Sequence, residues 1–98
     1  MYSRKGIMRR EPEFFGEREL VLVYMARRLK NALAVEKLFD DCALDYALET
    51  GPYQSGLLFL STKVGVFFYT APEDEARARQ LLSERGYKAY DADHPSRR

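Results

Sequence analysis

The side chains that could do chemistry are few in this chain, which holds one cysteine, Cys42, and one histidine, His94. A structural zinc site or a histidine-based triad would need partners that one chain does not supply. Cys42 falls on the apolar stripe of a predicted helix, which is typical of a structural thiol, and we expect His94 in an exposed tail. We predict no catalytic residue, metal site or cofactor and favour a non-enzymatic protein. An enzyme would need a site shared between subunits.

The best candidate for binding an anion is the segment "ARRLKN", residues 26–31. Its cations immediately precede a predicted helix start, where free backbone N–H groups point outward. The alternative is a solvated charge cluster with no ligand. The segment "GPYQSG", residues 51–56, is predicted as a loop and as a second binding element, near a different end of the sheet. The predicted ligand-binding residues are Arg27, Arg28, Lys30, Tyr53, Gln54 and Ser55.

Glu36 lies about 60° from the centre of the stripe on the first predicted helix, at about 100° per residue. At this margin the carboxylate is either partly buried and paired with an arginine or directed into solvent. The sequence favours the solvent-directed position.

Hydrophobic patterning predicts strands over residues 19–26, 45–50, 64–70 and 87–92. Residues 57–60, "LLFL", fit either a short strand or a buried turn. Helices are predicted between the first two strands and between the last two. The order β-α-β-β-α-β predicts an α+β ferredoxin-like sandwich, in which two helices cover one face of a four-stranded antiparallel sheet.

Local signals set the expected helix ends. Asn31 is the expected N-cap of the first helix. Thr70 and Glu73 fit a capping box for the second helix, and Gly86 is its expected C′ residue. We expect a flexible N-terminal tail over 1–17, one domain over 18–91 and a C-terminal tail over 92–98.

The stretch "TKVGVFFYT", residues 62–70, is apolar on both strand faces, although two helices cover only one face of a sheet. Four occupants could cover the second face: another copy of the chain, the tail through Phe14 and Phe15, an apolar ligand, or nucleic-acid bases. A homodimer is favoured and the tail comes second. The predicted interface residues are Val64, Val66, Phe68 and Tyr24, and the opposite set, 65, 67 and 69, stays an alternative.

Composition narrows the possible partners. The formal net charge of +1 gives no strong field for nucleic acid. The RNA-recognition motif places stacking rings on its third strand, whereas aligning Gly65 with its inner glycine puts Val64 and Val66 at those positions, so nucleic acid is not an expected partner. No apolar run approaches about 20 residues, so no membrane is expected. A single cysteine fits a reducing cytoplasm.

Short motifs follow this order of elements: Ala34, Glu36, Lys37 and Leu38 as "A-x-E-K-L", then "G-P-x-x-S-G" from Gly51, then "L-L-x-x-x-G-Y" from Leu81. Over about residues 20–90 the pattern resembles two kinds of small bacterial domain, the putative selenium/sulfur carrier-like proteins and the putative prokaryotic signal-transducing proteins. The carrier-like pattern has a cysteine directly before the loop glycine, where this chain has Ser55. The resemblance therefore implies a ferredoxin-like fold and a binding role for the loop, without carrier chemistry.

Together these features predict a small regulatory or binding module, dimeric, that binds a small anionic ligand or a protein partner. The alternative is an interaction domain that docks on another polypeptide and takes no small ligand.

Overall fold

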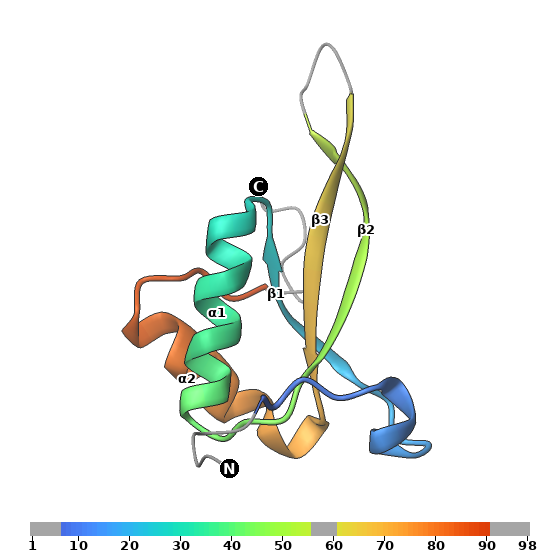
Figure 1. Cartoon of the computed structure of the whole chain (residues 1–98), viewed down its shortest axis with the longest axis vertical. Coiled ribbons are helices and arrows are strands. Elements are labelled where there is room, and N and C mark those ends of the chain that lie inside the picture. The colour runs from blue at the N-terminus through green and yellow to red at the C-terminus, as the bar shows by residue number, and fades with distance from the viewer. Residues whose placement is uncertain (1–6, 56–60, 91–98) are drawn as a thin grey trace.

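Strand β3 forms the centre of an antiparallel sheet in the computed structural model, which describes residues 7–55 and 61–90. Within these residues the sheet has three strands in the order β1-β3-β2, with β1 at Val21–Ala26, β2 at Ala47–Ser55 and β3 at Ser61–Thr70. Both neighbours of β3 run antiparallel to it. β2 and β3 continue past the end of β1 as a two-stranded arm (Figure 1).

Two helices lie on one face of this sheet (Figure 1). α1 spans Leu29–Asp41, and α2 spans Glu75–Glu84 after a short 3-10 turn at Pro72–Asp74. The α+β class with two helices and an antiparallel sheet is therefore confirmed. No helix among the described residues is long and apolar enough to cross a membrane.

The core lies between the helices and the sheet and contains the predicted stripes. Val35 and Phe39 of α1 and Leu82 of α2 are fully buried, as the helical spacing predicts. Phe68 of β3 lies at the centre, with its ring centroid 5.9 Å from that of Phe39. The ring centroids of Tyr24 and Tyr46 lie 5.9 Å and 5.8 Å from that of Phe68. Such clustered rings bury a large apolar area in a small domain.

The first helix begins earlier than predicted. Its N-cap is Arg28, and the N–H groups of Asn31 and Ala32 both donate to the Arg28 carbonyl oxygen at 3.1 Å. Because β1 ends at Ala26, the chain turns at once, and Asn31 already lies inside the first turn. The prediction that Asn31 caps the helix is wrong.

The predicted capping box of the second helix does not form. Thr70 is fully buried at the end of β3, and its hydroxyl donates to the Ala71 carbonyl at 3.1 Å. Glu73 pairs instead with Arg18 from the segment before β1. The end of α2 is as predicted, because Gly86 adopts a φ of +83°, which favours glycine.

Strand β2 is longer than predicted, since it continues through Gly51 and Pro52, which the sequence assigned to a loop. Gly51 pairs with Gly65 and Pro52 with Val64. Proline is tolerated because β2 is an edge strand, where the missing N–H faces away from β3. The prediction that the strand ends at residue 50 is wrong.

The predicted fourth strand is not formed over the described part of its range, 87–90. One backbone hydrogen bond, from Tyr90 N–H to the Val23 carbonyl at 2.7 Å, brings this segment beside β1. Residues 91–92, the C-terminal tail 92–98 and the stretch 57–60 lie outside the described residues.

The described part of the predicted N-terminal tail, residues 7–17, packs on the domain. Arg9 forms a parallel bridge with Tyr46 at the start of β2. A 3-10 turn at Pro12–Phe15 then buries the Phe15 side chain against Ala47 and Ala71. Phe15 therefore covers part of the second sheet face. The tail is the occupant of that face that the sequence places second, after another copy of the chain.

Candidate functional site

Two of the predicted binding residues meet at the base of the arm. The guanidinium carbon of Arg27 lies 5.5 Å from the centroid of the Tyr53 ring, within the range of a cation–π contact. The prediction that the segments 26–31 and 51–56 lie near different ends of the sheet is wrong. Because β2 continues through Pro52, it carries Tyr53 past the end of β1 and toward Arg27.

Gly65 makes room for this contact. A Cβ atom at Gly65 would lie 3.1 Å from Cδ1 of Tyr53 and 3.2 Å from the Ala26 carbonyl oxygen. Both distances are tighter than ordinary packing, so a side chain would displace the ring or the end of β1. Glycine thus lets the Tyr53 ring lie against the central strand, where Arg27 contacts it.

Further cations follow Arg27 in the chain and lie opposite Tyr53 in the sheet. Arg28 and Lys30 are exposed at the start of α1, and Lys63, the cross-strand partner of Tyr53, is exposed on the arm. Neither residues 26–35 nor residues 50–70 contain an aspartate or glutamate. We call Arg27, Arg28, Lys30, Tyr53 and Lys63 the basic corner. The first turn of α1 adds backbone N–H groups, since no side chain caps it.

Gln54 and Ser55, the other two predicted ligand residues, belong to β2. Their backbones pair with Thr62 and Ser61 in the arm. Their side chains lie outside the described part of the chain.

The predicted interface residues lie on the face that the helices cover. Phe68 and Tyr24 are buried in the core, so the prediction that they form an exposed interface is wrong. Val66 is half-buried against the same core. Val64 shares their face but lies beyond the helices and is 70% exposed. The second face therefore carries the alternative set, with Phe67 and Tyr69 half-buried.

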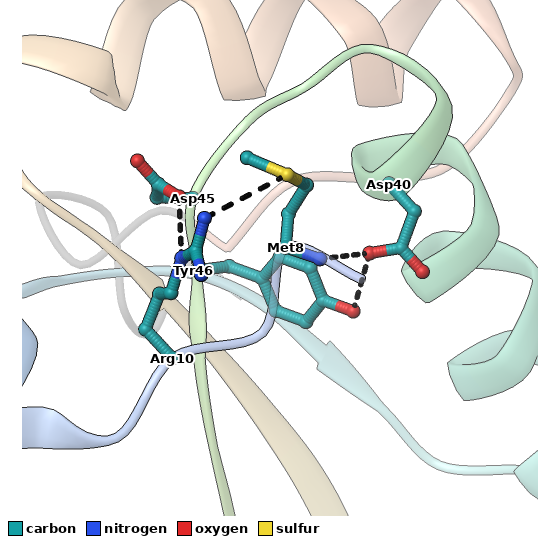
Figure 2. Close-up of polar contacts among 5 residues, drawn as sticks. All are labelled: Met8, Arg10, Asp40, Asp45 and Tyr46. Carbon is teal, nitrogen blue, oxygen red and sulfur yellow. Dashed lines mark hydrogen bonds and ion pairs between the residues drawn. The ribbon is translucent and has the colours of Figure 1, made fainter. Parts of the chain in front are cut away.

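Tyr46 is the centre of a polar cluster that sequence reasoning missed (Figure 2). Its ring is fully buried, and its hydroxyl lies 3.0 Å from Oε1 of Glu36 and 3.1 Å from Oδ1 of Asp40. Burial, and then the neighbouring Glu36 and Asp40 carboxylates, raise the pKa of Tyr46. One hydroxyl proton is thus shared between two carboxylates, and the phenol is held neutral.

The N-terminal segment completes this cluster. The Met8 N–H donates to Oδ1 of Asp40 at 2.8 Å, and Arg10 Nε lies 2.7 Å from Oδ1 of Asp45 (Figure 2). Nη1 of Arg9 lies 3.6 Å from Oε1 of Glu36. Glu36 is therefore partly buried and paired with an arginine, the alternative that the sequence did not favour. The sequence did contain a signal for this pairing, namely the excess of basic residues over 1–10. Basic residues in a folded segment can pair with the carboxylates of α1.

This cluster binds the segment to the domain and offers little chemistry of its own. Each carboxylate already accepts a donor from Tyr46, Met8 or an arginine. The Tyr46 ring is fully buried, and a neutral phenol held in this way is a poor nucleophile. We therefore assign the cluster a structural role.

The remaining reactive side chains are not gathered into a site. Cys42 is half-buried at the C-terminal end of α1, where its carbonyl accepts a hydrogen bond from Arg77. His94 lies outside the described residues. Across residues 7–55 and 61–90, no three histidine, cysteine, aspartate or glutamate side chains group closely enough to hold a metal ion.

The basic corner is thus the place where two of the predicted binding residues, Arg27 and Tyr53, come into contact. Comparisons with protein-family models, with curated proteins and with solved structures found no match to this chain.

Proposed function

We propose that this chain is a non-enzymatic binding module that takes a small anionic ligand at the basic corner. The observation that carries this proposal is the Arg27 guanidinium over the Tyr53 ring, which brings together two segments far apart in the sequence. The ring limits the directions that the guanidinium can take, so its donors are partly ordered before a ligand arrives. Less conformational entropy is then lost on binding.

The ligand class follows from the charges. Four cations and no acidic side chain in the two segments favour a phosphate or a carboxylate, and guanidinium groups bind both in a bidentate manner. Tyr53 is only half-buried, and its aromatic ring favours a planar group beside the anion. A nucleoside monophosphate combines the two features.

Thermal unfolding with inorganic phosphate, citrate and AMP tests the proposal. A ligand at about one hundred times its Kd adds about 2.7 kcal/mol to the folded state, a rise in Tm of about 10 to 20 °C for a domain of this size. We expect AMP to raise the Tm most, and Arg27→Ala with Tyr53→Leu to abolish the rise. Arg85→Ala, which removes an exposed charge at the end of α2, is the matched control and retains the response. No rise with any of the three anions contradicts the proposal.

A homodimer over the second sheet face is the second candidate. Phe67 and Met25 are directly paired across β3 and β1 on that face and are only half-buried, because Phe15 covers the opposite end of the face. Light scattering should give the mass of two chains, and Phe67→Asp should give the mass of one. Val64→Asp, on the other face of the same strand, is the control that stays dimeric. A wild-type chain with the mass of one molecule contradicts this candidate.

A ferredoxin-like sandwich with a fourth strand is part of the same proposal, together with a cytoplasmic location and a kinship with the two bacterial families. The hydrogen bond from Tyr90 to Val23 supports a fourth strand beside β1. Slow amide exchange at Tyr90, comparable with that of β1, is the expected result.

A further inference from the structure

Among the described residues, a neighbouring segment pairs with the outer edge of β2 at one end only. The Tyr46 carbonyl accepts from Arg10 N–H at 2.7 Å, and the Tyr46 N–H donates to the Met8 carbonyl at 3.2 Å. Backbone groups in a strand alternate in direction, so those of Leu48 and Thr50 point to the same side as those of Tyr46. Within residues 7–55 and 61–90 no further segment pairs with that edge. A row of free donors and acceptors therefore continues from the bridge.

One side of α1 faces this edge. Leu29, Leu33, Glu36 and Asp40 follow one another at intervals of four, three and four residues, which places them along a single side of the helix. Glu36 and Asp40 both contact the Tyr46 hydroxyl, so this side faces the β2 edge of the sheet. Ala26 at the end of β1 and Thr50 both pair with Val66, so α1 begins near the level of Thr50, and Leu29 and Leu33 extend the same side in that direction.

The apolar side chains there lack cover. Leu29 is 70% exposed and Leu33 is 56% exposed. On the sheet, Leu48 and Thr50 share the helix-covered face with Phe68, because Leu48 pairs with Phe68 and Thr50 with Val66. Leu48 is only half-buried and Thr50 is exposed. We call Leu29, Leu33, Leu48 and Thr50 the edge surface.

Cations border the edge surface. Arg28 and Lys30 flank Leu29, and Lys37, which pairs with Asp41, follows Leu33 by one helical turn. The nearest acidic side chain on this side of α1 is Glu36, which already accepts from Tyr46 and pairs with Arg9. The border is therefore complementary to a negatively charged partner.

We propose that the edge surface receives an extended acidic segment of another protein as an added strand next to β2. The backbone of that segment pairs with the free groups of Leu48 and Thr50. Its side chains that face α1 are apolar where they cover Leu29 and Leu33 and acidic at the end of the segment, beside Arg28 and Lys30. Strand addition of this kind takes its affinity from backbone hydrogen bonds and its specificity from alternate side chains.

A second copy of the chain fits the edge surface less well. In a symmetric pair each β2 edge would meet its own copy, which brings like charges of Arg28 and Lys30 together. Pro52 also removes one donor from each edge. An anionic membrane would meet the cations and the leucines but would leave the backbone groups of Leu48 and Thr50 without strand partners.

Selection of random eight-residue peptides displayed on phage, with the full chain as bait, tests the proposal. We expect enriched peptides to be acidic, with apolar residues at alternate positions. A fluorescein-labelled synthetic copy of the most enriched peptide then serves as the probe in anisotropy titrations. Leu33→Glu should weaken its binding at least about tenfold, since it adds a charge of the partner's own sign.

Two further variants separate the edge surface from other binding modes. Ala34→Glu adds the same charge to an exposed position on a different side of α1 and should change the Kd less than about threefold. Thr50→Pro removes an outward N–H together with the Thr50 side chain and should weaken binding about fivefold or more. The Arg27→Ala, Tyr53→Leu variant should still bind the peptide, so failure of the basic corner does not affect this test.

Four results would overturn the proposal. They are the absence of enrichment, enrichment of peptides without acidic residues, equal effects of Leu33→Glu and Ala34→Glu, and a dimer that Leu33→Glu dissociates. The last result assigns the edge surface to a second copy. Binding to phosphatidylserine vesicles that Leu33→Glu abolishes, without peptide enrichment, assigns it to a membrane.

Discussion

The two ends of β2 differ in how the rest of the chain covers them. At Tyr46 the N-terminal segment pairs with the strand edge, Phe15 covers the second face, and the Glu36 and Asp40 carboxylates meet donors. A few residues later no other described segment pairs with the edge, and leucines are exposed on α1. The segments 26–35 and 50–70, which supply the basic corner, contain no acidic residue.

This difference separates stability from binding along a single strand. The covered end holds the aromatic core and the matched charges, and we expect it to carry most of the free energy of unfolding. The uncovered end holds both proposed binding surfaces, the basic corner and the edge surface. Surfaces that bind must keep unsatisfied groups, so they add little to folding.

Substitution of Phe68 should give the largest effect. Truncation of this central ring in Phe68→Ala should lower the free energy of unfolding by about 3 to 5 kcal/mol, because a cavity is left among three other rings. Val64→Ala is the matched control on the same face of the same strand and should cost less than about 0.5 kcal/mol. Urea denaturation followed by circular dichroism measures both. Similar losses would mean that the exposed arm also carries core packing.

The next largest effect is expected at Phe15. Phe15→Ala removes the buried ring that holds the N-terminal segment on the second face, and we expect a loss of about 2 to 4 kcal/mol. Phe14→Ala is the control, since its neighbouring ring is 53% exposed. Phe14→Ala should lower the free energy of unfolding by less than about 1 kcal/mol. The loss comes mainly from the edge contact of Phe14 with Phe15 and from its contact with Arg10. A Phe15 loss no larger than that of Phe14 would contradict the view that this segment belongs to the folded domain.

Tyr46→Phe should cost about 1 to 3 kcal/mol, because two half-buried carboxylates lose a shared donor. Tyr69→Phe removes an exposed hydroxyl that donates to one carboxylate, Glu49, and should cost less than about 0.5 kcal/mol. The raised pKa of Tyr46 adds a pH signature. The folded state retains this proton where the unfolded state has lost it, so stability falls as the pH rises above 10.

Unfolding free energies measured between pH 9 and 11 should show this signature. Up to about 1.4 kcal/mol per pH unit is expected from one retained proton. Tyr46→Phe should make the fall of the unfolding free energy with pH less steep, by up to about 1.4 kcal/mol per pH unit. An unchanged slope would mean that Tyr46 ionises freely in the folded chain.

The sequence pattern predicted the helices and strands better than it predicted which residues pack around them. The stripes of Val35, Phe39 and Leu82 are local signals of helical period and proved to be core. The two faces of β3 are both apolar, so alternation alone could not say that Phe68 faces the helices and Phe67 faces away. That choice depends on how β3 sits between β1 and β2, which is a long-range property.

The errors at the site have the same origin. Gly51 and Pro52 have strong turn preferences, but a strand edge tolerates both, so β2 continued and carried Tyr53 to Arg27. The charges of residues 1–10 matched the pattern of a mobile tail. The partners of Arg9 and Arg10, which are Glu36 and Asp45, lie more than 25 residues later, beyond the range of any local signal.

The smallest effect we predict concerns Arg18 and Glu73, which join the segment before β1 to the turn before α2 at the covered end of the molecule. A hydrogen bond from its own backbone N–H, followed by the Arg18 guanidinium, holds the pKa of Glu73 below its usual 4.5. The folded state therefore binds this proton less tightly than the unfolded state. The resulting stabilisation is present above pH 4.5 and is lost as the pH falls through the lowered pKa of Glu73.

Titration of the Glu73 side-chain carbon by NMR measures this shift directly. Arg18→Met should raise the pKa of Glu73 only part of the way to 4.5, because the backbone hydrogen bond remains. The matched change Arg85→Met removes a cation from the end of α2 and should leave that pKa unchanged. If Arg18→Met also leaves it unchanged, the guanidinium is screened by solvent. The covered end would then be held by Phe15 and the Tyr46 cluster without help from its outermost ion pair.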